Sequence, residues 1–164
     1  MQDLFSEYPS QVRANTQRSD SSYARKTDYY AEHGRQPDTP APGAAVLFND
    51  GAIAVFKGRP AKDALQPAAL SPVYERHPGG SPAVPTGLVF IRFREGVEVA
   101  SRQREIERAG YEVAQSPPFA SNAAWLRARS GKIADALTGI PKLEALPEVE
   151  NVEPQMLLES THRK

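Results

Sequence analysis

Proline is unevenly distributed along this chain, which has 164 residues. Ten of its fifteen prolines lie at or before Pro85, and five lie after it. Because proline fixes its own φ angle and has no amide proton to donate, it is unfavourable inside helices and central strands. The distribution therefore predicts a mostly unstructured N-terminal half. The later prolines are expected at the loops and strand ends of a compact C-terminal domain.

The charge balance and the absence of cysteine limit the classes of function. Twenty basic and twenty acidic residues give no net charge, so there is no general electrostatic reason to bind nucleic acid or an anionic membrane. Without cysteine, the chain has no disulfide, no thiolate metal ligand and no cysteine nucleophile. Its histidines, His33, His77 and His162, fall in segments predicted as tail or loop. We expect no metal site and no cofactor.

The hydropathy pattern gives no sign of a membrane segment. No apolar run approaches the roughly 18 residues that span a bilayer. The first residues, Met1 to Pro9, contain neither a basic segment nor an apolar one, and so lack the pattern of a secretory signal. We therefore expect a cytoplasmic protein.

The first half of the chain divides into three segments by composition. Residues 1–43 are polar and show no sustained apolar periodicity, which predicts a disordered tail. Residues 44–58 hold two apolar runs around Asp50-Gly51. This dipeptide tolerates the positive φ angles of a tight turn, so the segment is predicted as a β-hairpin. Residues 59–86 are rich in Pro, Gly and Ala and are predicted as a linker, with a composition that allows a short helix over 61–70.

From Gly87 onwards the apolar pattern becomes regular. The pattern predicts a strand over 88–93, a helix over 98–109, strands over 111–114 and 122–128, an irregular helical segment over 130–146, and a strand over 149–153. This βαββαβ order predicts a ferredoxin-like α+β domain over residues 87–158, with an antiparallel sheet and two helices on one face. The fold itself is compatible with many functions.

Trp125, the single tryptophan, lies in the predicted strand over 122–128, and two positions are open to it. It packs beneath the N-terminal hairpin, or it lies on the exposed face of the sheet and anchors a partner. The second position is typical of binding proteins, because tryptophan is enriched at the centres of interfaces.

The end of the predicted domain has a distinctive sequence. Residues 133–137 read Ile-Ala-Asp-Ala-Leu, and residues 146–153 read Leu-Pro-Glu-Val-Glu-Asn-Val-Glu. Together with the first predicted strand and helix, this stretch resembles the propeptide domain of subtilisin-like serine proteases, over residues 87 to about 158. The resemblance implies a ferredoxin-like domain that lies with its sheet on two surface helices of the protease. It also implies that the domain inhibits the protease and assists its folding.

The resemblance further implies roles for residues near the C-terminal end. Glu153 stands where the family has an acidic residue that caps a protease helix, which is reasonable because a helix N-terminus presents unpaired N–H groups. Gln155 stands where many members have a second acid, so that contact is expected to be weaker. The extended tail, residues 159–164, would follow the active-site cleft like a product. The family's spacing places Leu158 in an apolar S4 pocket, or Leu157 if the register shifts by one residue, and Thr161 nearest the catalytic serine.

The chain departs from the family in having no catalytic domain after the propeptide-like segment. It also lacks the motifs of a serine protease. We therefore expect no enzyme but a stand-alone inhibitor or folding chaperone of a subtilisin-like protease. The main alternative is a ferredoxin-like regulatory or adaptor domain that binds another protein or a small ligand. A third hypothesis is an acylphosphatase-like enzyme, although Arg94-Glu95-Gly96-Val97 has little similarity to a phosphate-binding loop.

Overall fold

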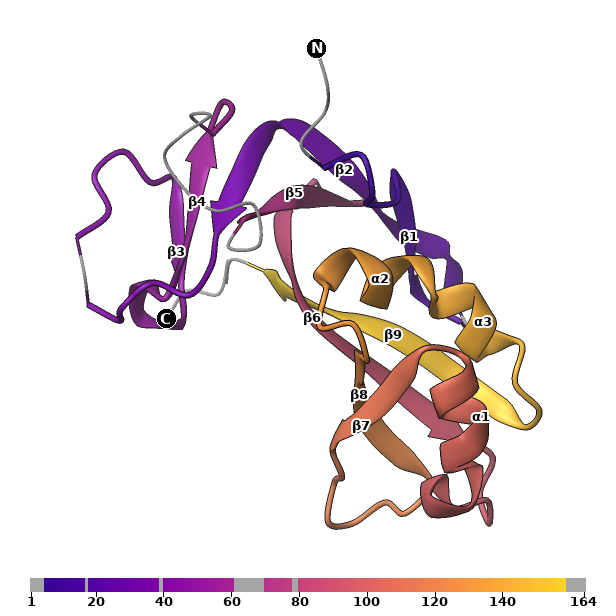
Figure 1. Ribbon diagram of the computed structural model, residues 1–164. Coiled ribbons are helices and arrows are strands. Elements are labelled where there is room, and N and C mark those ends of the chain that lie inside the picture. Colours follow the sequence, from indigo (N-terminus) through magenta and orange to yellow (C-terminus); the bar gives the residue numbers. More distant parts are fainter. Residues whose placement is uncertain (1–4, 17, 39, 61–69, 78–79, 159–164) are drawn as a thin grey trace, which may run out of the picture.

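The strands of the protein form one large antiparallel sheet. The computed structural model describes residues 5–16, 18–38, 40–60, 70–77 and 80–158 (Figure 1). These residues contain nine strands in the order β3-β4-β2-β5-β6-β8-β7, with β1 paired to β2 and β9 paired to β6. Every pairing is antiparallel.

The N-terminal half is built around one long strand, β2. It runs over Arg18–Glu32 and pairs with β1 (Gln11–Asn15), β4 (Ile53–Lys57) and β5 (Leu70–His77). β3 (Val46–Phe48) pairs with β4 across η1, a single 3₁₀ turn at Asn49–Gly51. Asp50 and Gly51 have φ angles of 57° and 92° within this turn, in the region that Asp and Gly tolerate.

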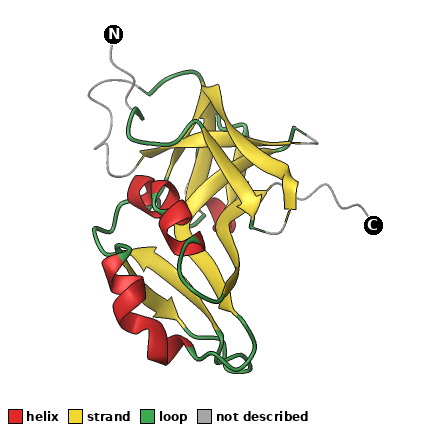
Figure 2. Cartoon of the chain, turned by 90° about the vertical axis from the view of Figure 1, so that its right-hand side faces the viewer, coloured by secondary structure: helices red, strands yellow, loops and turns green. Residues whose placement is uncertain are grey.

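The C-terminal half alternates strands with short helices, and Figure 2 shows the helices beside the strands. Its elements are β6 (Pro82–Phe93), η3 (Val99–Arg102), α1 (Gln103–Arg108), β7 (Tyr111–Gln115), β8 (Ala123–Ala128), α2 (Ile133–Thr138), α3 (Ile140–Glu144) and β9 (Val149–Leu158). α2 and α3 meet at Gly139-Ile140-Pro141, where proline occupies one of the first positions of α3. Within the described residues, no helix has both the length and the apolar character needed to cross a bilayer.

Two apolar clusters hold the sheet together. In the larger one, Ile106, Leu137 and Leu143 from the helices pack with Val89 and Ile91 of β6. The smaller one joins β2, β4, β5 and β6 through Ala31, Ile53, Val55, Val73 and Val84. β6 contributes to both clusters, so it connects the two halves of the molecule.

The prediction of a ferredoxin-like βαββαβ domain is wrong. The strand predicted over 88–93 is only the C-terminal part of β6. The N-terminal part of β6 pairs with β5, which in turn pairs with β2, so the sheet continues into the N-terminal half. The two expected helices are also reduced to segments of at most six residues. The fold is a mostly antiparallel sheet of nine strands in the described residues, with short helices beside it.

The predicted disordered tail and linker are also wrong for the parts that the structure describes. Residues 11–15 and 18–32 form β1 and β2, while 70–77 and 82–86 belong to β5 and β6. Two prolines of the expected linker lie at tolerated positions: Pro82 begins β6, and Pro85 borders a register shift against β9. The helix expected over 61–70 lies almost wholly outside the described residues. The hairpin expected over 44–58 coincides with β3 and β4.

Gly139 provides a test of the packing between the helices and β7. A Cβ atom built at Gly139 would lie 2.6 Å from the hydroxyl oxygen of Tyr111. That hydroxyl donates a 2.5 Å hydrogen bond to the carbonyl of Ala136. The φ angle of Gly139 is −85°, so the backbone itself would accept alanine. Gly139→Ala should therefore destabilise the fold by about 1–3 kcal/mol through overpacking alone.

Urea unfolding of Gly139→Ala measures this cost, and the same substitution in a Tyr111→Phe background is the control. Without the hydroxyl, the closest contact is relieved, so the alanine should cost less in the double variant than in the wild type. An equal cost in both backgrounds would contradict the packing described here.

His33 provides a test of the junction between the end of β2 and β5. Its Nε2 lies 2.8 Å from Oγ of Ser71, which is fully buried. Burial lowers the pKa of His33 from 6.5 to about 4. The unfolded chain therefore binds a proton at higher pH than the folded one, and stability should fall as the pH drops from about 6.5 to about 4. His33 contributes at most about 3 kcal/mol to this loss.

The measurement compares the free energy of unfolding of wild type and His33→Gln across this range. Carboxylates titrate in both proteins, so only the difference between them reports on His33. That difference should shrink toward pH 4 and stay constant above pH 7. A difference that does not change with pH would show that His33 is not buried in its neutral form.

Candidate functional site

One face of the C-terminal part of the sheet carries the chemistry of a binding surface. Along β6, Val89, Ile91 and Phe93 are fully buried, whereas Leu88, Phe90 and Arg92 are only partly buried. This alternation follows from the two-residue period of a strand, whose neighbouring side chains point to opposite faces. We call the second face the open face and define it by Leu88, Phe90, Arg92, Glu112, Trp125, Arg127 and Glu153.

The register of the strands brings the largest of these side chains together. Phe90 lies opposite Trp125 of β8 on one side and opposite Glu153 of β9 on the other. The rings of Phe90 and Trp125 meet edge to face, with centroids 5.1 Å apart and an angle of 60° between their planes. Such pairs are stabilising by about 0.5–1.5 kcal/mol beyond their buried area. The pair therefore forms a fixed aromatic surface near the middle of the open face.

Ion pairs lie on either side of the aromatic pair. Nε of Arg127 on β8 lies 2.6 Å from Glu112 on β7, and Nε of Arg92 on β6 lies 3.4 Å from Glu150 on β9. Pairs this exposed contribute only about 0–1 kcal/mol to stability. Their arrangement gives the open face an apolar centre with a charged rim, which is the usual composition of a protein-binding surface.

Glu153 lies at the border between the open face and the N-terminal strands. Its carboxylate accepts a 2.7 Å hydrogen bond from Nδ2 of Asn151, two residues earlier in β9. The nearby Tyr23 of β2 has a raised pKa, mainly because it is buried; Arg76 lowers that pKa and the charge of Glu153 raises it. Glu153 is therefore half-buried, oriented by one donor, and close to both halves of the molecule.

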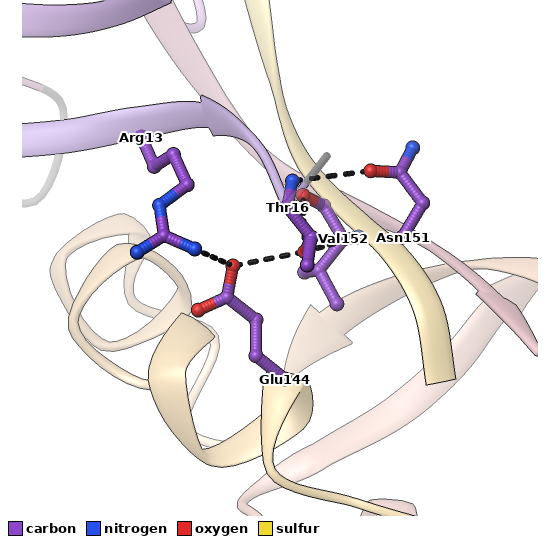
Figure 3. Close-up of polar contacts among 5 residues, drawn as sticks. All are labelled: Arg13, Thr16, Glu144, Asn151 and Val152. Carbon is purple, nitrogen blue, oxygen red and sulfur yellow. Dashed lines mark hydrogen bonds and ion pairs between the residues drawn. The ribbon is translucent and has the colours of Figure 1, made fainter. Parts of the chain in front are cut away.

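The turn between β1 and β2 is joined to β9 by a group of polar contacts (Figure 3). The amide N–H of Thr16 donates to Oδ1 of Asn151 over 3.1 Å, and Oγ1 of Thr16 accepts from the amide of Val152 over 2.9 Å. Oγ1 of Thr16 also donates to Glu144 at the end of α3, over 2.9 Å, and Glu144 pairs with Arg13. These contacts fix the edge of β9 beside Glu153.

The other residues predicted from the sequence lie further along β9 or beyond it. Gln155 accepts a 2.8 Å hydrogen bond from Oγ1 of Thr86. Leu157 pairs with Val84 and packs on the smaller apolar cluster, and Leu158 pairs with Ala83 and packs on the larger one. Thr161 lies outside the described residues. The structure thus brings Glu153 next to Phe90 and holds both leucines in the sheet.

Some residues of this site were missed by sequence reasoning. Trp125 lies on the sheet face, which is one of the two positions left open for it, and Phe90 is its cross-strand partner. The alternation of Val89, Phe90 and Ile91 could have indicated Phe90. Nothing local could have indicated Asn151 and Thr16, because they meet across 135 positions of sequence.

His33 and Ser71 are the residue types of a general base and a nucleophile, but Ser71 is not accessible to a substrate. Ser71 has no exposed surface, and its hydroxyl donates to the carbonyl of Pro72 over 3.0 Å. A substrate could not reach the oxygen without opening the junction of β2 and β5, so we assign the pair a structural role. Over the described part of the chain, no three acidic or histidine side chains gather in a way that would hold a metal ion.

The arrangement as a whole suits recognition of another protein by surface contact. Its features are an aromatic pair, a charged rim and an oriented carboxylate on a rigid sheet. Comparison of the chain with protein-family models, with curated protein sequences and with solved structures gives no match.

Proposed function

We propose that the chain binds and inhibits a subtilisin-like serine protease and assists the folding of that protease. The open face of β6, β7, β8 and β9 would contact the surface of the enzyme, and the residues after β9 would enter its active-site cleft. The observation that carries the proposal is the Phe90–Trp125 pair on a partly exposed sheet face with the carboxylate of Glu153 beside it.

The aromatic pair would supply most of the binding energy. Tryptophan and other large aromatic residues dominate the energetics of interfaces when they lie near the centre and are surrounded by polar groups that exclude water. Phe90 and Trp125 have this position between the Arg127–Glu112 and Arg92–Glu150 pairs. Both rings are already fixed against each other, so their ordering costs little further entropy on binding.

Glu153 would add direction to this contact. The N-terminus of a helix presents unpaired N–H groups and a positive partial charge, and a carboxylate is the natural partner for it. Because Asn151 occupies one carboxylate oxygen of Glu153, the other oxygen can accept from such a helix. The proposed partner surface is therefore one with a helix N-terminus next to an apolar patch.

Entry of Leu158 into an apolar subsite of the protease would have a cost. Leu157 and Leu158 are paired with β6 and packed on the apolar clusters. Either leucine must leave this pairing before it can occupy a protease pocket. Gains in the cleft would have to offset the apolar burial that is lost, which is about 25 cal/mol for each Å².

One prediction of the proposed function concerns the aromatic pair. Inhibition constants should be measured for the purified chain against a panel of subtilisin-like proteases. Trp125→Ala and Phe90→Ala should each weaken inhibition by about 30-fold or more, the loss expected for a residue at the centre of an interface. Leu47→Ala is the control, because Leu47 is a large apolar side chain, 52% exposed, on β3 at the far end of the sheet. It should inhibit like the wild type.

Far-ultraviolet circular dichroism and thermal unfolding show whether each variant remains folded. Absence of inhibition by the wild type across the whole panel at micromolar concentration would overturn the proposed function. Equal losses in Leu47→Ala and Trp125→Ala would show that the open face is not the contact surface.

Another prediction of the proposed function concerns the residues after β9. Removal of residues 159–164 leaves every pairing of β9 in place, since β9 ends at Leu158. The shortened chain should therefore keep the melting temperature of the wild type but inhibit at least tenfold more weakly, because it no longer fills the cleft. A chain that is shortened after Gln155 is not a suitable test, since it also loses the packing of Met156, Leu157 and Leu158. Unchanged inhibition after removal of 159–164 would mean that binding does not use the cleft.

A further inference from the structure

Asn151 is a buried polar residue whose side chain uses both ends of its amide. It is only 4% exposed. Oδ1 accepts from the amide of Thr16, at 3.1 Å, and Nδ2 donates to Oε2 of Glu153, at 2.7 Å. A buried amide keeps such partners because a buried donor or acceptor without a partner destabilises the fold. Thr16 thus fixes the rotamer of Asn151, and the amide of Asn151 in turn holds the carboxylate of Glu153.

Thr16 is itself held in place by several contacts. Its hydroxyl accepts from the amide of Val152 and donates to the carboxylate of Glu144. Glu144 also meets Nη1 of Arg13, at 3.3 Å (Figure 3). The turn between β1 and β2 therefore reaches Glu153 through a continuous path of hydrogen bonds, from Thr16 through Asn151.

The orientation of Glu153 affects binding because a free glutamate on a strand surface populates several rotamers. Ordering such a side chain at an interface costs conformational entropy, which lowers the affinity. Less of that entropy is lost on binding when Asn151 already holds the carboxylate in the free protein. The carboxylate of Glu153 is therefore already held by one donor in the free protein.

We propose that Asn151, fixed by Thr16, is a positioning residue that orients Glu153 toward a partner helix. The inference rests on the proposed function, in which Glu153 accepts from a helix N-terminus. It adds that the N-terminal strands β1 and β2 control the affinity of a surface that they do not form. Asn151 acts through Glu153 and does not need to touch the partner.

Asn151→Asp separates this role from a purely structural one. The aspartate has the same shape and can still accept from the amide of Thr16, but it has no N–H to donate and places a second negative charge beside Glu153. The contact with Thr16 should keep the fold, at reduced stability because two carboxylates then lie side by side, and inhibition of the protease should weaken by about tenfold. If Asn151 serves only to satisfy Thr16, Asn151→Asp should inhibit like the wild type.

A double-mutant cycle with Glu153→Ala assigns the effect. Asn151→Asp should cost nothing further in the Glu153→Ala background, since its effect passes through that carboxylate. An undiminished tenfold loss in that background would mean that residue 151 acts on the partner directly, which would overturn the positioning role. Thr16→Val, which removes the hydroxyl but keeps the amide, should weaken inhibition less than Asn151→Asp.

A measurement without any protease keeps the inference independent of the proposed function. The side-chain rotamer of Glu153 is determined by NMR couplings and NOEs in the wild type and in Asn151→Asp. A single rotamer in the wild type that becomes averaged in the variant supports the positioning role, even if no protease in the panel is inhibited. In that case the proposed function fails alone. An averaged rotamer in the wild type, or the same single rotamer in both proteins, overturns the positioning role.

Discussion

The pairing of β6 with its neighbours is the constraint on which the rest of the structure depends. This strand pairs with β5 at its start, with β8 along its C-terminal part and with β9 on its other edge. Its buried side chains enter both apolar clusters. Because side chains alternate between faces, a slip of one residue would bury Phe90 and expose Val89 and Ile91. The open face exists only in the observed register, which the packing of the helices against Val89 and Ile91 determines.

The parts of the fold that could be predicted are those in which a segment carries its own apolar pattern. The strands predicted over 88–93, 111–114 and 149–153 fall within β6, β7 and β9, and the one over 122–128 begins one residue before β8. Asp50-Gly51 lies in the turn between β3 and β4. β2 could not be predicted, because its sequence is polar and its pairing with β1, β4 and β5 supplies what the sequence lacks. The prolines were misleading for the same reason: a strand tolerates proline wherever the pairing needs no N–H.

The candidate site shows the same division. Trp125 and Glu153 could be singled out from the sequence, since one is a lone tryptophan in a strand and the other belongs to a family-like ending. Their positions beside Phe90 depend on the register of the strands. The contact of Asn151 with Thr16 joins segments from opposite ends of the sequence. Long-range contacts of this kind leave no periodic trace in a single sequence. Individual residues of a binding surface on a sheet can therefore be predicted from sequence, but the extent of the surface cannot.

The register shift in β6 between Pro85 and Val89 has a consequence for how β9 moves. It divides the pairing of β9 into two blocks, one over Val149–Pro154 and one over Met156–Leu158. The first block is clamped by Thr16, whereas the second is a short pairing with Ala83, Val84 and Pro85 whose side chains pack on the two apolar clusters. Blocks of this kind open as separate cooperative units, each with its own free energy. We therefore expect the end of β9 beyond Gln155 to open at a free energy of its own, separate from that of the block that holds Glu153.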